Sequence, residues 1–197
     1  MQRIATSNIG EIFEALDRQI GSAGGEPVAL VVIGGTALAV LGYVSRTTKD
    51  VDVLGELASD PKHTIREIRA FPDWLVKAAK KVRRDFNLPD NWLNFGPTAQ
   101  IRTGLPEGFR ERLTEKKYGN FLRICFCDRL DQIHFKLYAS IDRGGYHVED
   151  LAALNPSVDE ILKASRWVLT QDVSFPFKEL LKDFLRRHGY RNAAEGI

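Results

Sequence analysis

The sequence contains little of what marks membrane, secreted or disulfide-bonded proteins. Only two cysteines and one methionine occur among its 197 residues. The longest apolar run, residues 28–33, is far shorter than the roughly 20 residues that a membrane-spanning helix needs. The first ten residues are polar and lack the apolar segment of a signal peptide. We therefore expect a soluble, cytoplasmic protein without a membrane partner.

The two cysteines are poorly suited to a disulfide or a metal site. Cys125 and Cys127 are two positions apart on an expected strand, so their side chains face the same side and cannot easily bond to each other. They also lack a distant Cys or His at ligand spacing. We expect both to be thiols of the hydrophobic core.

Composition and charge fit an ordinary globular domain. Hydrophobic residues make up 44% of the chain and charged residues 27%, and the net charge of +2 is too small to indicate a nucleic-acid partner. One expected helix is nevertheless strongly basic, because it carries Lys77, Lys80, Lys81, Arg83 and Arg84. Such a face either contacts an RNA backbone or is simply solvated, and a solvated face is the more common case.

Strand patterns occupy the first two thirds of the sequence, and the remainder is helical. The expected strands are residues 28–33, 50–54, 98–102 and 121–126. The expected helices are residues 7–21, 36–43, 61–87 in two pieces, part of 106–117, 130–142, 147–154, 157–169 and 176–188. This order predicts an α+β fold: a core of residues 1–154, with a short mixed sheet and an N-terminal helix, then a helical annex of residues 155–197 in the same compact unit.

The segment after the first strand has the properties of a phosphate-binding turn. Gly34 and Gly35 lack a Cβ, so the backbone there can turn tightly and approach a phosphate closely. Thr36 opens the next helix with its hydroxyl and the free N–H groups of a first turn, which attract anions. Taken alone, a Gly-Gly pair is usually only a turn.

Two carboxylates follow on the second strand. Asp50 and Asp52 are expected to project from one face, with Cα atoms about 6–7 Å apart. Unneutralised, they would repel each other by about 1–3 kcal/mol. Mg²⁺ or Mn²⁺ bound between them removes this repulsion, and Mg²⁺ also accepts substrate phosphates as ligands. A lone Asp-x-Asp is usually a solvated edge or a cap, but the order of strand, Gly-Gly-Thr, helix and Asp-Val-Asp is far more specific.

This combination resembles the signature of the DNA polymerase beta-like nucleotidyltransferase superfamily. The matching residues are Gly34-Gly35-Thr36 and the run 46–52, Arg-Thr-Thr-Lys-Asp-Val-Asp. The form of that run is similar to the abortive-infection type IV toxin branch (AbiEii-like) and to related uncharacterised domains. The segments 88–94, 135–139 and 149–154 resemble the latter group, so the likeness covers about residues 28–154.

The resemblance implies a minimal nucleotidyltransferase core and roles for further residues. Arg46 and Thr48 would join the glycine turn in binding the nucleotide. Lys136 would neutralise charge as pyrophosphate leaves, and Asp150 would act as a base or as a further carboxylate beside the metal. Read without the resemblance, these two are a surface lysine and an aspartate favoured by a helix dipole.

The sequence departs from the superfamily at one point. Many members carry a third carboxylate on a later central strand, whereas the expected strand 121–126 contains no acidic residue. The third ligand is therefore open among Asp128, Asp131 and Asp150, and Asp128 can also serve as the cap of the following helix.

We expect an enzyme that uses Mg²⁺ or Mn²⁺ to move an NMP from an NTP to an acceptor hydroxyl. The resemblance implies tRNA or a protein as acceptor, and a toxin with a cognate antitoxin as partner. The alternative is a weak or inactive nucleotide-binding or protein-interaction module on the same fold, which the missing acid on strand 121–126 favours.

Overall fold

The computed structural model describes residues 2–60 and 64–197. They form two compact units: unit 1 comprises residues 1–102 and 108–127, and unit 2 comprises residues 103–107 and 128–197. No helix in the part of the chain that the structure describes is long and apolar enough to cross a membrane.

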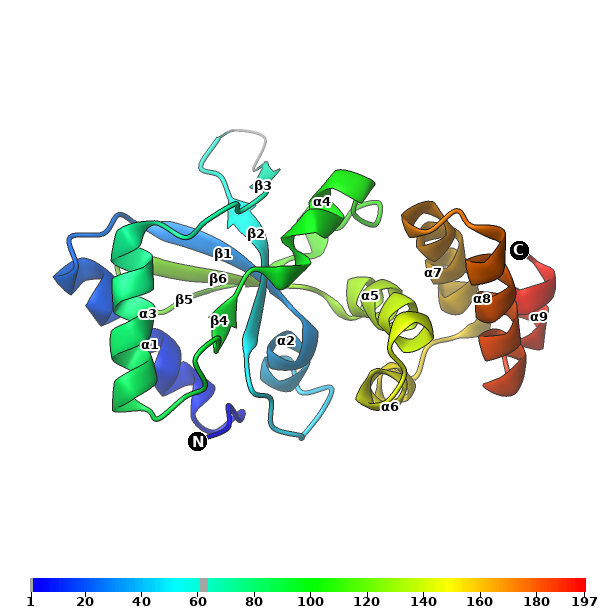
Figure 1. The fold of residues 1–197 in the computed structure, drawn as a ribbon, viewed down its shortest axis with the longest axis horizontal. Coiled ribbons are helices and arrows are strands. Elements are labelled where there is room, and N and C mark those ends of the chain that lie inside the picture. Colours follow the sequence, from blue (N-terminus) through cyan, green and yellow to red (C-terminus); the bar gives the residue numbers. More distant parts are fainter. Residues whose placement is uncertain (1, 61–63) are drawn as a thin grey trace. The chain divides into compact units, whose positions relative to one another are not determined.

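Unit 1 is built on a mixed β-sheet, which has six strands among the described residues (Figure 1). The strands are β1 Val28–Ile33, β2 Val51–Leu57, β3 Ile65–Arg66, β4 Leu93–Asn94, β5 Thr114–Lys117 and β6 Leu122–Phe126. Their order is β3-β2-β1-β6-β5, with β4 paired to β2. The central strand β1 runs antiparallel to β2 and parallel to β6. This mixed sheet confirms the fold class that the sequence predicts.

The helices of unit 1 are short and mostly amphipathic. Their bounds are α1 Ile9–Ser22, α2 Gly34–Val40, α3 Asp73–Asp85 and α4 Gln100–Thr103, with the 3₁₀ turns η1 Gly96–Ala99 and η2 Arg110–Arg112. The last residue of α4, Thr103, already belongs to unit 2.

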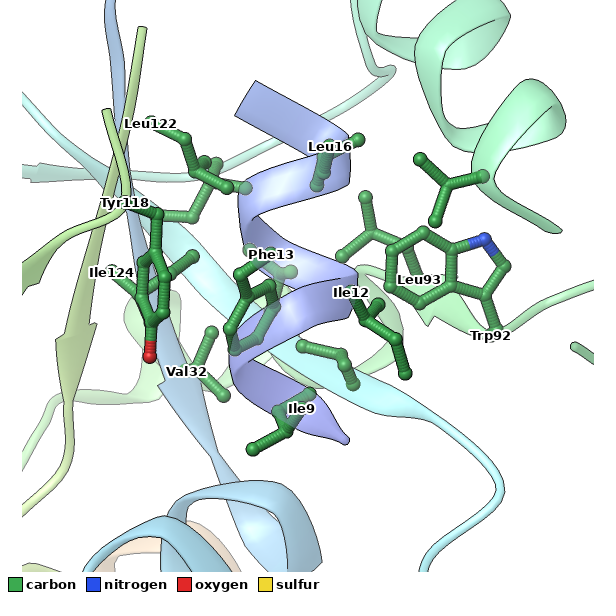
Figure 2. Close-up of a cluster of buried hydrophobic side chains, with 14 of the residues drawn as sticks. Ile9, Ile12, Phe13, Leu16, Val32, Trp92, Leu93, Tyr118, Leu122 and Ile124 are labelled. Atoms are coloured by element: carbon green, nitrogen blue, oxygen red, sulfur yellow. The ribbon is translucent and has the colours of Figure 1, made fainter. Parts of the chain in front are cut away.

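Helix α1 holds the core of unit 1 together. Its large buried apolar residues recur every three or four positions, so they form one apolar stripe along the helix. Figure 2 shows this stripe facing residues of β1, β6 and the segment that contains β4, with Trp92 on one side of the helix and Tyr118 on the other. The labelled residues of α1 are Ile9, Ile12, Phe13 and Leu16, and those of the two strands are Val32, Leu122 and Ile124.

Unit 2 is entirely helical in its regular structure. Its helices are α5 Arg129–Asp142, α6 Tyr146–Ala153, α7 Val158–Gln171, α8 Phe175–Arg187 and α9 Arg191–Glu195. Ser157 and Glu160 form a capping box at the start of α7. We expected the core to extend to residue 154, whereas α5 and α6 lie with the C-terminal helices in unit 2.

Two sequence-based expectations about elements are wrong. Residues 98–102 form η1 and α4 instead of a strand. In the first half of the helix expected over 61–87, the described residues contain the short strand β3, and residues 61–63 lie outside the described part. The charged segment 106–117 is helical in part, as expected, at the 3₁₀ turn η2. It continues into the edge strand β5, which was not expected and whose residues are all exposed.

Candidate nucleotide-binding site

The glycine turn sits at the end of the central strand. Ile33 ends β1 in extended conformation, and α2 begins at once with Gly34 (Figure 1). Gly34 has φ +73°, in the left-handed region that residues with a Cβ adopt only at a cost of about 1–2 kcal/mol. The sequence placed the helix start at Thr36, two residues later than the structure does.

The carboxylate of Asp52 lies directly against Gly34. The antiparallel register pairs Asp52 of β2 with Ile33 of β1. A Cβ built on Gly34 would lie 2.7 Å from Asp52 Oδ2, closer than real Cβ contacts come. Only glycine therefore leaves room for this carboxylate beside the turn, and the two signals in the sequence meet at one point in space.

A β-bulge sets this register. Val31 pairs with Gly55, but the next residue, Val32, pairs with Val53, so Leu54 is the extra residue on β2. Without the bulge, the residue opposite Ile33 would be Val53, and its side chain would take the place beside the turn that Asp52 occupies. The bulge thus aims a carboxylate, and not a valine, at the glycine turn.

Asn94 holds the Asp52 carboxylate. It is paired with Asp52 in the parallel β2–β4 register. Its Nδ2 donates a hydrogen bond to Asp52 Oδ1 at 3.2 Å, and its Oδ1 accepts one from Gly96 N at 3.0 Å. Sequence reasoning assigned Asn94 no role, because β4 is only two residues long and pairs with a strand some 40 positions away.

Asp50 lies just before β2, and threonines fix its position. Thr36 Oγ1 donates a hydrogen bond to the Asp50 backbone oxygen at 2.8 Å. Thr48 Oγ1 lies 3.2 Å from Asp50 Oδ1 and 3.3 Å from the same backbone oxygen. The hydroxyl of Thr36 thus donates its proton to a backbone oxygen, and this hydrogen bond connects α2 to the residue that precedes β2.

Arg46 lies beside the second glycine of the turn. A Cβ built on Gly35 would be 3.2 Å from both Arg46 Nη2 and Thr48 Oγ1. The structure therefore brings Arg46 and Thr48 together with the glycine turn, as expected of nucleotide-binding neighbours. A guanidinium supplies several donors for phosphate oxygens, and this one is half-buried.

The side chains at the turn suit a hard divalent cation. Asp50 and Asp52 are half-buried carboxylates, and carboxylate oxygens are ligands that Mg²⁺ prefers. Among residues 2–60 and 64–197, no three His, Cys, Asp or Glu side chains are grouped to hold a metal ion. Asp50 and Asp52 would supply two carboxylates at most, and the other ligands of a cation would have to come from phosphate and water.

Lys136 and Asp150 meet each other inside unit 2. Lys136 Nζ lies 2.8 Å from Asp150 Oδ2, and the side chains are 5% and 1% exposed. The lysine also lies over the ring of Tyr146, with its Nζ 5.8 Å from the ring centroid. The ion pair joins α5 to α6, and each charge neutralises the other. The residues around Lys136 and Asp150 in the sequence do not predict that the two side chains meet.

The other acidic candidates have structural contacts of their own. Asp128 is the N-cap of α5 and accepts a hydrogen bond from Leu130 N at 2.8 Å. Asp131 follows in the first turn of α5 and is fully buried.

Cys125 on β6 and Cys127 just after it are both buried, and they form no disulfide. Burial raises the pKa of Cys125 to about 12, so this thiol stays protonated and unreactive at neutral pH.

Comparison with known proteins identifies a family to which this chain is similar. Neither the curated proteins nor the solved structures gave a match. A family model described as a nucleotidyltransferase of unknown function (DUF6036) matches residues 9–164, which include α1, the whole sheet and the glycine turn. Because this match covers most of the chain, the protein belongs to that nucleotidyltransferase family.

Proposed function

We propose that the protein binds an NTP at the β1–α2 turn and transfers its NMP to an acceptor hydroxyl. The observation that carries this proposal is the Asp52 carboxylate 2.7 Å from where a Gly34 Cβ would stand. A turn without side chains accommodates phosphate groups, and a carboxylate beside it accommodates the cation that accompanies them. The family supports the same class of reaction.

Each residue of the turn has a part in this reaction. Gly34 and Gly35 let the Asp52 carboxylate and the Arg46 guanidinium lie directly against the turn, and Arg46 donates hydrogen bonds to the phosphates. Asp50 and Asp52 hold Mg²⁺ or Mn²⁺, which, when bound, withdraws charge from the phosphates. Thr36, Thr48 and Asn94 are positioning residues, because their hydrogen bonds fix the two aspartates.

The chemical step exchanges a phosphoanhydride bond of the NTP for a phosphoester bond to the acceptor. The acceptor oxygen forms a bond to the α-phosphorus, and the bond from this phosphorus to the bridging oxygen breaks, so pyrophosphate leaves with the electron pair. The acceptor proton passes to a base, for which Asp150 remains the predicted group. Lys136 remains the predicted partner of the leaving pyrophosphate, and both roles would require their buried ion pair to open.

The proposed acceptor and biological role follow from the AbiEii-like resemblance. The acceptor is then a tRNA or a protein, and the chain is a toxin with a cognate antitoxin. This rests on the motif form around Arg46 and Asp52 and on the segments that follow it.

A second candidate function is a nucleotide-binding or protein-interaction module without transfer activity. The specific observation in its favour is Asp128, the closest sequence match to a third carboxylate, which caps α5 through its Oδ1. The two functions share the nucleotide site and differ only in transfer.

Thermal unfolding with each NTP, with and without Mg²⁺ or Mn²⁺, tests nucleotide binding. At a ligand concentration 100 times Kd, binding stabilises the folded state by about 2.7 kcal/mol, which raises Tm by several degrees. The shift should require the metal and disappear in Asp52→Asn, and it should persist in Glu56→Gln, a carboxylate change on the same strand. No shift with any NTP would contradict both transfer and nucleotide binding, and would leave only the protein-interaction module.

A further inference from the structure

Helix α3 concentrates the positive charge of the chain. It contains five Lys or Arg and two Asp, so its net charge of +3 exceeds the +2 of the whole chain. Its apolar residues Leu75, Ala78 and Val82 are buried against the rest of unit 1. The helix therefore presents its charged side chains outward by the ordinary amphipathic pattern.

These cations line an open groove beside α1, which packs against α3 (Figure 1). The groove has a volume of about 510 Å³. On the α1 side, Gln19, Ser22 and Ala23 line it. On the α3 side, its basic residues are Lys77, Lys80, Lys81, Arg83 and Arg84. We call this feature the basic groove.

Three of the five cations have no carboxylate partner among the described residues. Lys81 pairs with Asp85 at 2.8 Å, and Arg83 pairs with Asp90 at 2.8 Å. Lys77, Lys80 and Arg84 are exposed and form no ion pair in the part of the chain that the structure describes. They follow one another at three- and four-residue intervals, so they lie along one side of the helix.

The spacing of these three cations suits a chain of regularly placed anions. Seven helical residues from Lys77 to Arg84 rise about 10 Å. Along each strand of a B-form duplex, phosphates recur every 3.4 Å of axis, so the row spans about three nucleotide steps of such a strand. An open groove also admits a continuous strand, which could contact all three cations at once.

The basic groove is distinct from the nucleotide site. Its α1 side is the last turn of that helix, which leads through residues 23–27 to the first residue of β1. The glycine turn follows the last residue of β1, one strand length or about 20 Å away along the chain. A polymer in the groove and an NTP at the turn would therefore occupy separate places on unit 1.

We propose that the basic groove between α1 and α3 binds the phosphate backbone of a nucleic acid. This inference does not depend on the proposed transfer reaction, because binding in the groove needs neither NTP nor metal. Recognition is by charge, and it therefore weakens steeply with salt. RNA and DNA offer the same phosphates and are told apart by experiment.

The test is fluorescence anisotropy of a labelled 20-nucleotide single strand, as RNA and as DNA, with the full chain between 50 and 200 mM KCl. The variant Lys77→Gln/Lys80→Gln/Arg84→Gln removes three cations and keeps side chains that favour helices. Each phosphate contact contributes about 0.7 to the slope of log K against log salt, so this slope should fall by about 2. Affinity at 50 mM KCl should fall at least tenfold.

The matched control removes three exposed cations of unit 2, in Lys163→Gln/Arg166→Gln/Arg191→Gln. It has the same net charge as the groove variant, and it should bind like wild type. Tm values of both variants should match wild type, since all six residues are exposed. Equal binding of RNA and DNA supports recognition of the backbone alone, and tighter binding of RNA supports recognition of its backbone with the 2′-hydroxyl.

Three outcomes would overturn the proposal. The first is no binding of either strand by wild type at 50 mM KCl. The second is an equal loss of affinity in the groove variant and the control variant, which would show that binding depends only on the net charge of the protein. The third is competition by poly-glutamate as effective as that of the nucleic acid at equal charge, which would point to an acidic protein.

Discussion

At Gly34 the chain needs both a left-handed backbone and an absent side chain. Gly24 has nearly the same backbone, with φ +69° against +73°, but a Cβ there would meet nothing within 4 Å. Gly34→Ala and Gly24→Ala should therefore each lower the free energy of unfolding by about 1–2 kcal/mol. Only Gly34→Ala should abolish the metal-dependent Tm shift with NTP, because its Cβ displaces the Asp52 carboxylate. Equal shifts in both variants would show that the turn does not hold the nucleotide.

Asn94 makes a second residue-scale prediction. Asn94→Ala removes the donor to Asp52 Oδ1 and should raise the Mn²⁺ concentration for half-maximal stabilisation by ATP about 10- to 100-fold. Asn91→Ala, an exposed asparagine three positions earlier, should leave this concentration unchanged. A lower Tm without a change in metal dependence would mean that Asn94 only supports the fold.

The residues of the site could be predicted from sequence only where local pattern determines them. Gly34, Gly35, Asp50 and Asp52 follow from a buried strand, a turn and an Asp-x-Asp. Their juxtaposition depends on a bulge at Leu54, and the only local signal for it is Gly55, a glycine inside a strand pattern. Asn94 depends on strand pairing at long range, so it could not be found from its neighbours.

At the scale of elements, the Lys136–Asp150 ion pair connects α5 to α6. Lys136→Met should lower the free energy of unfolding by about 3–5 kcal/mol, because it leaves Asp150 charged and buried. Lys136→Met/Asp150→Leu should regain most of this loss, since apolar side chains replace buried ion pairs well. Urea unfolding of the single and double variants measures both values. Losses that simply add would mean that the two charges do not stabilise each other.

The start of α7 makes a prediction about pH. The pKa of Glu160 is lowered below its usual 4.5, chiefly by the hydrogen bonds that Arg129 donates to this carboxylate. A hydrogen bond from the Ser157 backbone N–H lowers it further. A lowered pKa stabilises the fold above pH 4.5, and this contribution disappears as the pH falls through the lowered value. Glu160→Gln should therefore have a lower Tm than wild type at pH 7, and the two values should converge toward pH 3. A difference that is constant from pH 7 to pH 3 would contradict an ionic origin.

Elements were predictable where apolar periodicity is strong. The buried run Val28–Ile33 and the amphipathic stripe of α1 were predicted almost to the residue. Strand β5, Thr-Glu-Lys-Lys, has no apolar residue and exists because β6 pairs with it. Its charges suit an exposed sheet edge, where they oppose aggregation. A run of charged residues is also typical of a solvated helix, so the sequence did not distinguish the two.

At the scale of the whole molecule, the chain combines a nucleotidyltransferase-type sheet unit with a helical unit. Sequence patterns predicted both kinds of structure. The sequence patterns placed the boundary between the sheet core and the helical annex after residue 154, whereas α5 already belongs to unit 2. Helix periodicity does not say which neighbours a helix packs against, because that depends on contacts such as those of α5 with α6 and α7.

The most direct test of the central claim is transfer of label from α-labelled NTPs to total cellular RNA and protein, with Mg²⁺ or Mn²⁺ present. Wild type and Glu56→Gln should place label in a macromolecule, and Asp50→Asn and Asp52→Asn should place none. Label that stays in free nucleotide with wild type, while the metal-dependent Tm shift persists, would leave the binding module as the function. Transfer that continues in Asp52→Asn would contradict the assignment of the Gly34–Asp52 site as the catalytic centre.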